Sequence, residues 1–343
     1  MATRADVARL AGVPPSSVSY VISNKRKVSQ ETRQKVLAAI KELNYHPNYM
    51  AGALSTGQSK MIAVSSATNS INDLQIYSEY LNGIIEAASK QDFLTLIVPH
   101  QLTFESGRFE TLLDSGIMAG FIVLCEPKLN SLGSKLKLRD YPHVSVEHSP
   151  KRKSFNGITV DYEGAALSAI EILKSHGHKK VALIYSDEIS NTFLSKVKKL
   201  KINISLFQIE NYLLAGRNIA ETFIEENIDS TAVICLSSQA GFGFREHWDF
   251  IFGNLTTETL SYISVGSSEE VPSRSMTQIN RMSFDFKAIG SQAFEKLVSS
   301  LREPDEGPDN TLWRATYFEG STVSNPRAGP LSNYHHIEGN YPS

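Results

Sequence analysis

The first sixty residues hold the densest cluster of side chains able to bind a charged partner. They carry nine Lys and Arg residues against three Asp and Glu residues, a net charge of +6. The remainder carries 25 basic and 33 acidic residues, so the formal charge of −2 hides a basic segment joined to an acidic one. Such a basic cluster is either a solvated surface or a binding surface for a polyanion such as nucleic acid.

Patterns that mark catalytic or nucleotide sites are incomplete. Gly241-Phe-Gly243 lacks the third glycine of a dinucleotide fingerprint, and no phosphate-binding loop, zinc-protease or serine-hydrolase motif occurs. His176 and His178 flank a predicted helix-to-strand turn, where a partly cationic imidazole stabilises the helix end; metal binding is the weaker alternative. His335-His336 could bind a metal adventitiously. We therefore expect neither an enzyme nor a resident cofactor.

Two short helices separated by a glycine are predicted at the N-terminus. Thr3-Arg-Ala-Asp6 has the pattern of a capping box, and the helix that begins there stops at Gly12. Val13-Pro14-Pro15 forms a tight turn into the second helix, because proline suits the first helical position. Within a basic segment this arrangement is typical of a helix-turn-helix, whose second helix enters the DNA major groove.

A third helix follows, capped by Ser29 and ended before Pro47. Apolar residues spaced three or four apart predict the buried faces of the helices. These are Val18, Val21 and Ile22 in the second helix and Val36, Leu37, Ile40 and Leu43 in the third.

Four segments of this region carry a specific pattern: Thr3-Arg-Ala-Asp-Val-Ala-Arg-Leu-Ala-Gly-Val13, Ser17-Val-Ser19, Val28-Ser-Gln-Glu-Thr-Arg-Gln-Lys-Val36 and Leu43-Asn-Tyr-His-Pro-Asn48. They closely resemble the start of the LacI/GalR family of bacterial transcriptional regulators. Weaker landmarks extend the resemblance to about residue 324: Asn82-Gly-Ile-Ile-Glu-Ala-Ala88, Gly157 to Ala165, Ser175 to Ala182 and Asp285 to Gly290. The resemblance implies a DNA-binding headpiece, a hinge, and a dimerising core that resembles periplasmic sugar-binding proteins.

We accordingly expect four parts. They are a helix-turn-helix headpiece at 1–46, a hinge helix and linker at 47–59, a two-lobed effector-binding and dimerisation core at 60–324, and a flexible C-terminal tail at 325–343. The tail is predicted from its Pro, Gly, Ser and Asn content without periodicity. The fold class is α/β, with an all-α headpiece and parallel sheets in the core.

The resemblance also implies how DNA is contacted. Pro15, Ser16 and Tyr20 match positions that face base edges, whereas Ser17 and Ser19 match positions that hold phosphate oxygens. Pro14 stands where the family usually has a capping serine, which predicts a slight shift of the helix start. The complete implied set is Thr3, Pro15, Ser16, Ser17, Ser19, Tyr20, Asn24, Lys25, Asn48, Tyr49, Ala51 and Leu54.

The hinge at 47–54 is too short to be a stable helix in water, so we expect it to form on DNA beside its dimer mate. Gly52 makes its folding more dependent on DNA. Leu54 matches a leucine that the family inserts into the minor groove, where an apolar wedge bends the duplex. The alternative is that Leu54 packs on the core.

From Met61 onward, short apolar runs alternate with longer amphipathic stretches, the pattern of a parallel α/β sheet. The strands expected are 61–66, 93–98, 120–125, 143–147, 181–185, 232–236 and 262–265. The helices expected are 74–90, 105–115, 162–176, 214–226 and 285–301. About 265 residues exceed one comfortable core, so we expect two similar lobes with a cleft between them.

The cleft departs from the sugar-binding members of the family. No arginine occurs between Ser186 and Lys201, and the usual Asn-Asp pair is replaced by Ser237-Ser238. Val265-Gly266 is followed by Ser267-Ser268, so groups that grip sugar hydroxyls have become hydroxyls themselves. One reading is that the effector differs from a sugar and is less polar. The other is that the cleft no longer binds a small molecule, and that the regulator is controlled by a protein partner or not at all. The residues expected to line an effector pocket are Tyr77, Glu147, Phe193, Ser238, Ser268 and Phe284.

Composition places the 343 residues, 41% of them hydrophobic, among ordinary globular proteins. The longest apolar run, Ala119 to Cys125, is too short to span a bilayer, and no signal peptide is recognisable. We expect a cytoplasmic protein whose partners are double-stranded DNA and a second copy of itself. Cys125 and Cys235 are expected to be buried core residues and not a disulfide. A sugar-binding module without a DNA function is the competing class, but it leaves the first sixty residues unexplained.

Overall fold

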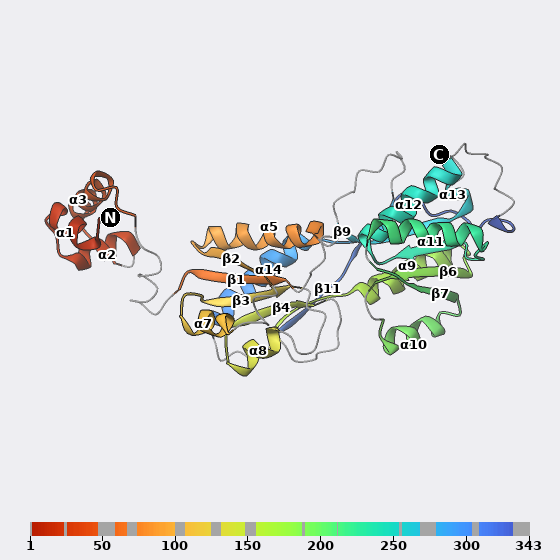
Figure 1. The fold of residues 1–343 in the computed structure, drawn as a ribbon, viewed down its shortest axis with the longest axis horizontal. Helices are drawn as coiled ribbons and strands as arrows, with labels where there is room; N and C mark the ends of the chain where they lie inside the picture. The colour runs from red at the N-terminus through yellow and green to blue at the C-terminus, as the bar shows by residue number, and fades with distance from the viewer. Residues whose placement is uncertain are drawn as a thin grey trace. The chain divides into compact units, whose positions relative to one another are not determined.

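A computed structural model describes residues 2–23, 26–46, 59–66, 74–99, 107–124, 132–147, 156–186, 189–210, 212–253, 256–267, 279–303 and 309–331 (Figure 1). The chain forms two compact units. One comprises residues 1–61 with 109–119, and the other comprises residues 62–108 with 120–343.

The N-terminal helices are α1 (Arg4–Ala11), α2 (Pro15–Ser23) and α3 (Gln30–Glu42). The predicted capping box is confirmed: the Thr3 side chain accepts from the Asp6 backbone, and the Asp6 side chain accepts from the Thr3 backbone. Gly12 ends α1 with φ of +65°, a conformation that glycine adopts without strain. Ser29 caps α3 as expected.

The three helices enclose a small core centred on Val7, Val18 and Val36, which are fully buried. The expected burial of Ile22 and Leu37 is wrong, because their exposed fractions are 36% and 49%. Each directly follows a buried valine and lies about 100° further round its helix, beyond the edge of the buried face that Val18 and Val21 form in α2 and Val36 and Ala39 form in α3. The absent serine cap at Pro14 does not move the helix, since α2 begins at Pro15 as the proline rule predicts.

The first core sheet has the strand order β11-β5-β4-β3-β1-β2. Its strands are β1 (Met61–Ser66), β2 (Leu94–Pro99), β3 (Gly120–Leu124), β4 (His143–Glu147), β5 (Gly157–Val160) and β11 (Asn310–Trp313). The helices that contact it are α5 (Leu74–Lys90), α8 (Leu132–Leu138) and α14 (Phe286–Arg302), and α7 (Arg108–Asp114) precedes β3 in the chain. In Figure 1, α5 and α14 lie on one face and α8 on the other.

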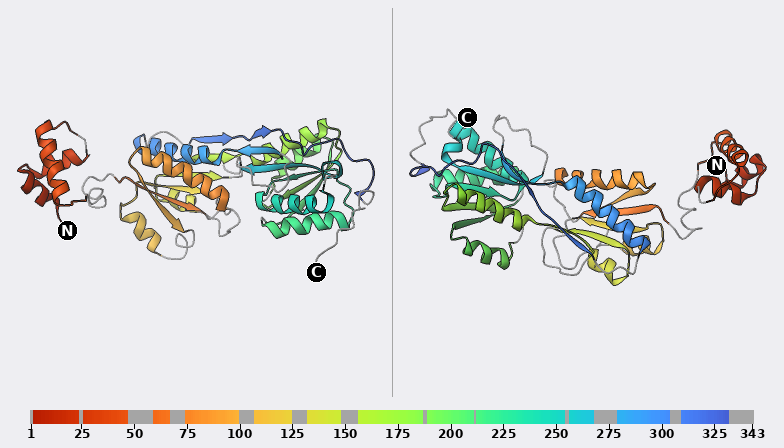
Figure 2. Two further views of the ribbon diagram at one scale, coloured as in Figure 1. Left: turned by 90° about the horizontal axis from the view of Figure 1, so that it is seen from above. Right: turned by 180° about the vertical axis from the view of Figure 1, so that it is seen from behind.

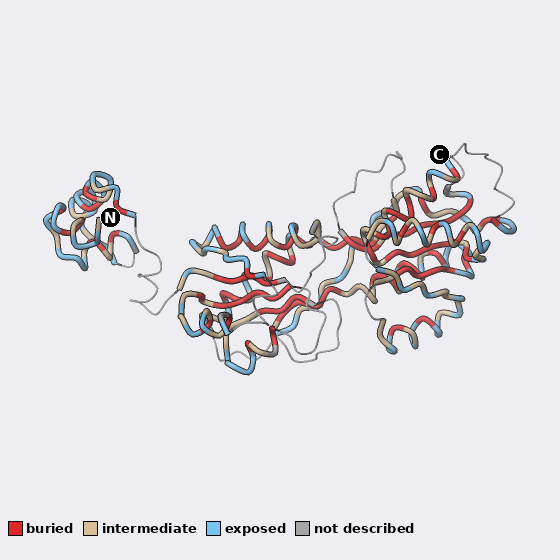
Figure 3. The backbone as a smooth tube through the Cα atoms, in the orientation of Figure 1, coloured by how far each residue is buried: buried red, intermediate tan, exposed pale blue. Residues whose placement is uncertain are grey.

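The second core sheet has the order β12-β10-β9-β8-β6-β7, in which only the β10–β12 pair among those described is antiparallel. Its strands are β6 (Lys180–Tyr185), β7 (Asn203–Gln208), β8 (Ala232–Cys235), β9 (Ser261–Ser267), β10 (Asn280–Phe284) and β12 (Thr316–Phe318). Its helices are α9 (Tyr162–Ser175), α10 (Asn191–Lys199), α11 (Leu213–Glu225), α12 (Ser238–Phe252) and α13 (Thr256–Thr259). Buried residues are concentrated in the strands of both sheets (Figure 3).

The chain passes between the two sheets more than once. Strand β10 belongs to the second sheet, but α14, which follows it, packs on β3, β4 and β5 of the first sheet. Strands β11 and β12 are close in sequence and likewise belong to different sheets. Figure 2 shows α14 lying along α5. Each lobe is therefore completed by segments distant in the sequence, and neither is a continuous domain.

Close helix contacts depend on glycine in both lobes. A Cβ atom at Gly83 of α5 or Gly290 of α14 would overlap the backbone of the opposite helix. The same holds for Gly216 of α11 and Gly243 of α12. The two lobes thus use the same device, a pair of helices brought together at facing glycines.

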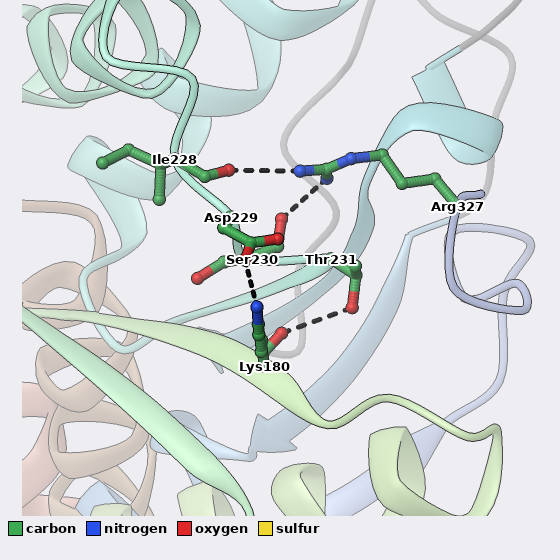
Figure 4. Close-up of polar contacts among 6 residues, drawn as sticks. All are labelled: Lys180, Ile228, Asp229, Ser230, Thr231 and Arg327. Carbon is green, nitrogen blue, oxygen red and sulfur yellow. Dashed lines mark hydrogen bonds and ion pairs between the residues drawn. The ribbon is translucent and has the colours of Figure 1, made fainter. Parts of the chain in front are cut away.

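The expectation of a flexible tail from residue 325 is wrong for residues 325–331 (Figure 4). Arg327 is 9% exposed and donates to three backbone oxygens of the second lobe. Leu331 is fully buried in a cluster with Phe223 and Trp248. Composition alone indicates disorder here, whereas the hydrogen bonds of Arg327 and the burial of Leu331 hold the segment against the second lobe.

No helix within the described segments is long and apolar enough to cross a membrane. Those segments likewise contain no group of three metal-ligating side chains.

Candidate nucleic-acid interface and effector site

The outward face of α2 is set by the burial of its other side. Val18 and Val21 point into the small core, so Ser16 and Tyr20, four positions apart, share the opposite face. Pro15 and Ser16 are exposed, and Ser17, Ser19 and Tyr20 are half-buried. The structure thus brings five predicted DNA-contacting residues onto one short helix. None of the nine residues of α2 is charged.

Two arginines from outside α2 contact this face. Arg4, the first residue of α1, donates from Nη1 to the Ser19 hydroxyl at 3.2 Å. Ser19 in turn donates to the Pro15 backbone oxygen at 3.2 Å. The guanidinium carbon of Arg26 lies 5.5 Å from the centre of the Tyr20 ring, within cation–π range. Arg4 and Arg26 were not among the residues predicted from sequence, because their contacts with this face depend on how they pack against α2.

Thr3 has a structural role that the sequence also predicts. Its hydroxyl donates to the Asp6 carboxylate at 2.6 Å, and its backbone N–H donates to the same oxygen at 2.9 Å. These hydrogen bonds, with a smaller contribution from the Arg9 charge, lower the pKa of Asp6. The DNA contact implied for Thr3 remains a prediction beside this capping role.

The exposed charges of the three helices are mostly basic. Arg9 pairs with Asp6 at 3.3 Å, and Lys35 pairs with Glu31 at 2.8 Å. The hydrogen bond and charge of Lys35 lower the pKa of Glu31, so both acidic residues remain ionised near neutral pH. These exposed pairs contribute little to stability but leave Arg4, Arg26, Lys27 and Lys41 without a carboxylate partner in the part of the chain described.

The other predicted DNA contacts, Asn24, Lys25, Asn48, Tyr49, Ala51 and Leu54, lie outside the described residues. The same holds for Ser268 and for the side chains of Glu147 and Ser238, which stand at the end of β4 and the start of α12.

Phe193 and Phe284, predicted to line an effector pocket, are packed in the core. Their exposed fractions are 2% and 0%. The Phe284 ring lies 4.9 Å from that of Tyr162. Tyr77 on α5 is half-buried and packs against the same cluster. The structure gives Phe193 and Phe284 a packing role, and Tyr77 keeps the exposure that a ligand contact needs.

Three buried serines were not among the residues expected to line an effector pocket, although Ser237 belongs to the Ser237-Ser238 pair already noted. Ser65, Ser237 and Ser283 are at most 3% exposed, and their hydroxyls have no hydrogen-bond partner within the described structure. Ser65 and Ser283 lie near the carboxyl ends of β1 and β10, and Ser237 lies two residues beyond the end of β8. Ligands of open parallel sheets bind at these strand ends, and a buried polar group without a partner costs free energy. The sequence signal was a serine interrupting the end of an apolar strand.

Cys235 is fully buried, as predicted, and Cys125 lies outside the described residues. Burial raises the pKa of the Cys235 thiol to about 12, so it stays protonated. Cys235 is a packing residue without nucleophilic character.

Comparison with known proteins agrees with this geometry. The family model described as "Bacterial regulatory proteins, lacI family" matches residues 3–48. The HTH-type transcriptional repressor PurR of Vibrio atlanticus (strain LGP32) is 26% identical over 94% of this chain and 99% of its own length. The HTH-type transcriptional regulator AglR of Rhizobium meliloti (strain 1021) is 24% identical over 95% and 96%.

Among solved structures, that of the lac repressor dimer bound to operator and the anti-inducer ONPF aligns with a TM-score of 0.78. It shares 21% identity and covers 94% of this chain and 99% of that chain, which shows a common fold. The fold is therefore that of the lac repressor, with N-terminal helices and two lobes of the periplasmic-binding-protein type. The N-terminal motif, the full-length relatives and the fold therefore all resemble those of the LacI/GalR family of bacterial transcriptional regulators.

Proposed function

We propose that the protein is a sequence-specific transcriptional repressor that binds an inverted-repeat operator as a homodimer. The observation that carries this is the outward face of α2, on which Pro15, Ser16, Ser19 and Tyr20 stand clear of a helical core within a segment of net charge +6. A hydroxyl-rich face on a short helix suits base edges, and the surrounding charge suits phosphates.

On DNA, Ser16 can donate to or accept from several base edges, whereas Pro15 offers only apolar contact, for instance to a thymine methyl group. Tyr20 can contact a base or a phosphate, so discrimination depends strongly on it. Ser17, Asn24 and Lys25 would hold phosphates and fix the register without selecting sequence, and Ser19 would do so only by turning its proton away from the Pro15 oxygen.

We propose that residues 47–59 form the hinge and linker, and that Leu54 enters the minor groove at the centre of the operator. Two hinges side by side would stabilise each other as helices only in the dimer on DNA. The half-sites would then lie about one helical turn, roughly 34 to 36 Å, apart.

The edge strand β2 is the surface that we propose for dimerisation. Leu94, Leu96 and Ile97 are 48%, 37% and 52% exposed on this outer strand of the first sheet. An exposed apolar edge strand is a liability unless another chain covers it. The lac repressor structure, which shares this fold, is that of a dimer.

The unpartnered hydroxyls of Ser65, Ser237 and Ser283 support an effector bound at the carboxyl ends of the strands. The lac repressor structure holds a small ligand, the anti-inducer ONPF. An effector that binds one arrangement of the two lobes more tightly than another would shift the protein toward that arrangement. The shift would change the affinity for the operator, by at most the difference between the effector's affinities for the two arrangements. The replacement of charged groups by serines also supports the second candidate, a core controlled by a protein partner.

The test is binding of the purified full-length protein to sequences selected from random DNA, at two salt concentrations. A repressor of this kind selects an inverted repeat and loses affinity steeply as salt rises. A metabolite panel is then added while operator affinity and thermal stability are followed. A metabolite that shifts both identifies the effector, whereas silence across a broad panel favours control by a protein partner.

A further inference from the structure

Helix α2, which we propose enters the major groove, lacks the basic side chains most often used to recognise guanine. Its sequence, Pro15-Ser-Ser-Val-Ser-Tyr-Val-Ile-Ser23, contains no Arg, Lys, Asn or Gln. Bidentate donation from Arg or Lys to the O6 and N7 atoms of guanine is the commonest specific contact in the major groove. If the protein discriminates G·C pairs strongly, the donor has to come from outside α2.

Of the two arginines that contact the outward face of α2, Arg26 stacks on the Tyr20 ring, whereas Arg4 is held there by a hydrogen bond. Its Nη1 donates to the Ser19 hydroxyl at 3.2 Å across 15 positions of the chain. Because Ser19 donates its own proton to the Pro15 oxygen at 3.2 Å, its hydroxyl is oriented to accept from Arg4. The hydrogen bond to Ser19 thus holds the Arg4 guanidinium next to Tyr20, one of the side chains expected to face base edges.

The remaining donors of Arg4 are available. A guanidinium carries five N–H donors, and one of those of Arg4 goes to Ser19. The nearby carboxylate of Asp6 is already bonded to Thr3 and paired with Arg9. Arg4 forms no ion pair in the described part of the chain, and its side chain is exposed.

The position of Arg4 in its own helix argues against a stabilising role. It is the first residue of α1, where the helix dipole is positive and disfavours a cation. Acidic residues suit that end of a helix, and cations suit the other. An arginine there is therefore better explained by a partner outside the protein than by the stability of α1.

We infer that Arg4 is a specificity-determining residue that donates to a guanine in each half-site, with Ser19 as its positioning residue. The inference rests on the proposed function, in which α2 enters the major groove. A contact from Arg4 to a phosphate is the competing role, and it would add affinity without selecting a base.

The experiment compares sequences selected from random DNA by the full-length wild type, Arg4→Ala and Arg4→Lys, with Arg9→Ala as a matched control. Arg9 lies on the same helix and carries the same charge, but it pairs with Asp6. Urea unfolding of each variant establishes that it is folded. Affinities are then measured on the wild-type operator and on operators altered at one symmetric base pair at a time.

We expect Arg4→Ala to lose the preference for one G·C pair per half-site, with discrimination there falling roughly tenfold to hundredfold. Arg4→Lys should keep part of that preference, Ser19→Ala should weaken it at the same pair, and Arg9→Ala should keep the wild-type sequence preference. If Arg4→Ala selects the wild-type operator and loses affinity evenly on every sequence, the inference is overturned while the proposed function stands. If the wild type itself selects no inverted repeat, both fail.

Discussion

Arg327 donates from Nη1 to the backbone oxygen of Ser230 at 2.7 Å, although 97 positions separate them (Figure 4). The same nitrogen donates to the Thr259 oxygen at 2.9 Å, and Nη2 donates to the Ile228 oxygen at 3.1 Å. One buried guanidinium therefore ties the loop before β8, the end of α13 and the C-terminal segment together. Arg327, which lies in a segment predicted from composition to be a flexible tail, therefore connects three parts of the second lobe.

Replacing Arg327 by alanine should destabilise the second lobe. Three backbone oxygens would lose a charged donor, and a buried acceptor left without its partner costs about 1 to 3 kcal/mol. Arg314→Ala is the matched control, because Arg314 is exposed between β11 and β12. Urea unfolding followed by circular dichroism measures the difference. Equal midpoints for the two variants would show that Arg327 does not hold the lobe.

Stability should decrease in mild acid because of His178. This residue is 2% exposed, and its Nε2 donates to the Ser324 oxygen at 2.9 Å while its Nδ1 lies 2.8 Å from the Thr231 hydroxyl. Burial lowers the pKa of His178 below 6.5, and the charges of His176 and Arg327 act in the same direction. The unfolded chain then binds the proton more tightly than the folded chain.

The contribution of His178 to the free energy of unfolding is therefore greatest above about pH 6.5 and is lost as the pH falls through the lower folded pKa. Urea midpoints of the wild type and His178→Gln at pH 7.5 and pH 5 test this. The wild type should lose more stability than the variant over that interval. Parallel losses would mean that other groups cause the acid sensitivity. His46→Gln serves as control, since its imidazole is exposed and remote in sequence from His178.

Tyr20→Ala should weaken binding to the cognate operator by about 1 to 3 kcal/mol and leave binding to scrambled DNA nearly unchanged. The reason is that Tyr20 shares the outward face of α2 with Ser16 and its ring is held under Arg26. Fluorescence anisotropy on both DNAs gives the two affinities. Equal losses would identify Tyr20 as a phosphate contact. Tyr45→Phe is a suitable control because Tyr45 is buried in the headpiece core.

Leu54→Ala should weaken operator binding and remove most of the DNA bend. An apolar wedge that unstacks a central base step needs a side chain of this size, and alanine is too short to reach between the bases. A circular-permutation assay, in which the operator stands at different positions along DNA fragments of equal length, measures the bend angle. An unchanged bend would place Leu54 on the core instead, and Leu54→Met, which retains length and apolar character, should behave like the wild type.

Much of the fold could be predicted from local patterns. The capping box at Thr3, the stop at Gly12 and the cap at Ser29 mark the ends of the first three helices, because these signals act within one helical turn. The seven predicted strands and five predicted core helices all occur, with ends shifted by a few residues. Fully buried strands such as β3 are continuous apolar runs and are easy to recognise.

The interior strands β5 and β10 were missed because polar residues such as Thr159 and Asn280 interrupt their apolar runs. Three other missed strands share a different physical cause. Strands β7, β11 and β12 lie at sheet edges and mix exposed with half-buried residues, so they show no apolar run. Helix α12 contains Gly241 and Gly243, which weaken its helical signal, yet Gly243 permits the close contact with α11. Such elements are decided by neighbours that are remote in sequence.

The residues of the candidate site were likewise predictable where a local pattern marks them and not where tertiary packing decides their position. The predicted face of α2 follows from local periodicity, whereas Arg4 reaches that face only because α1 and α2 pack together. Phe193 and Phe284 were expected at a ligand, and burial shows that they pack in the core. The orphan hydroxyls of Ser65, Ser237 and Ser283 became visible only when hydrogen-bond partners could be sought in three dimensions.

The central claim is that the basic N-terminal helices of two copies read an inverted repeat. The most direct measurement is the affinity of the purified dimer for its selected inverted repeat, for one half-site alone and for a scrambled duplex, at matched salt. The full repeat should bind at least a thousandfold more tightly than the scrambled duplex, with the half-site far weaker than the whole. Equal affinity for all three duplexes would contradict the account.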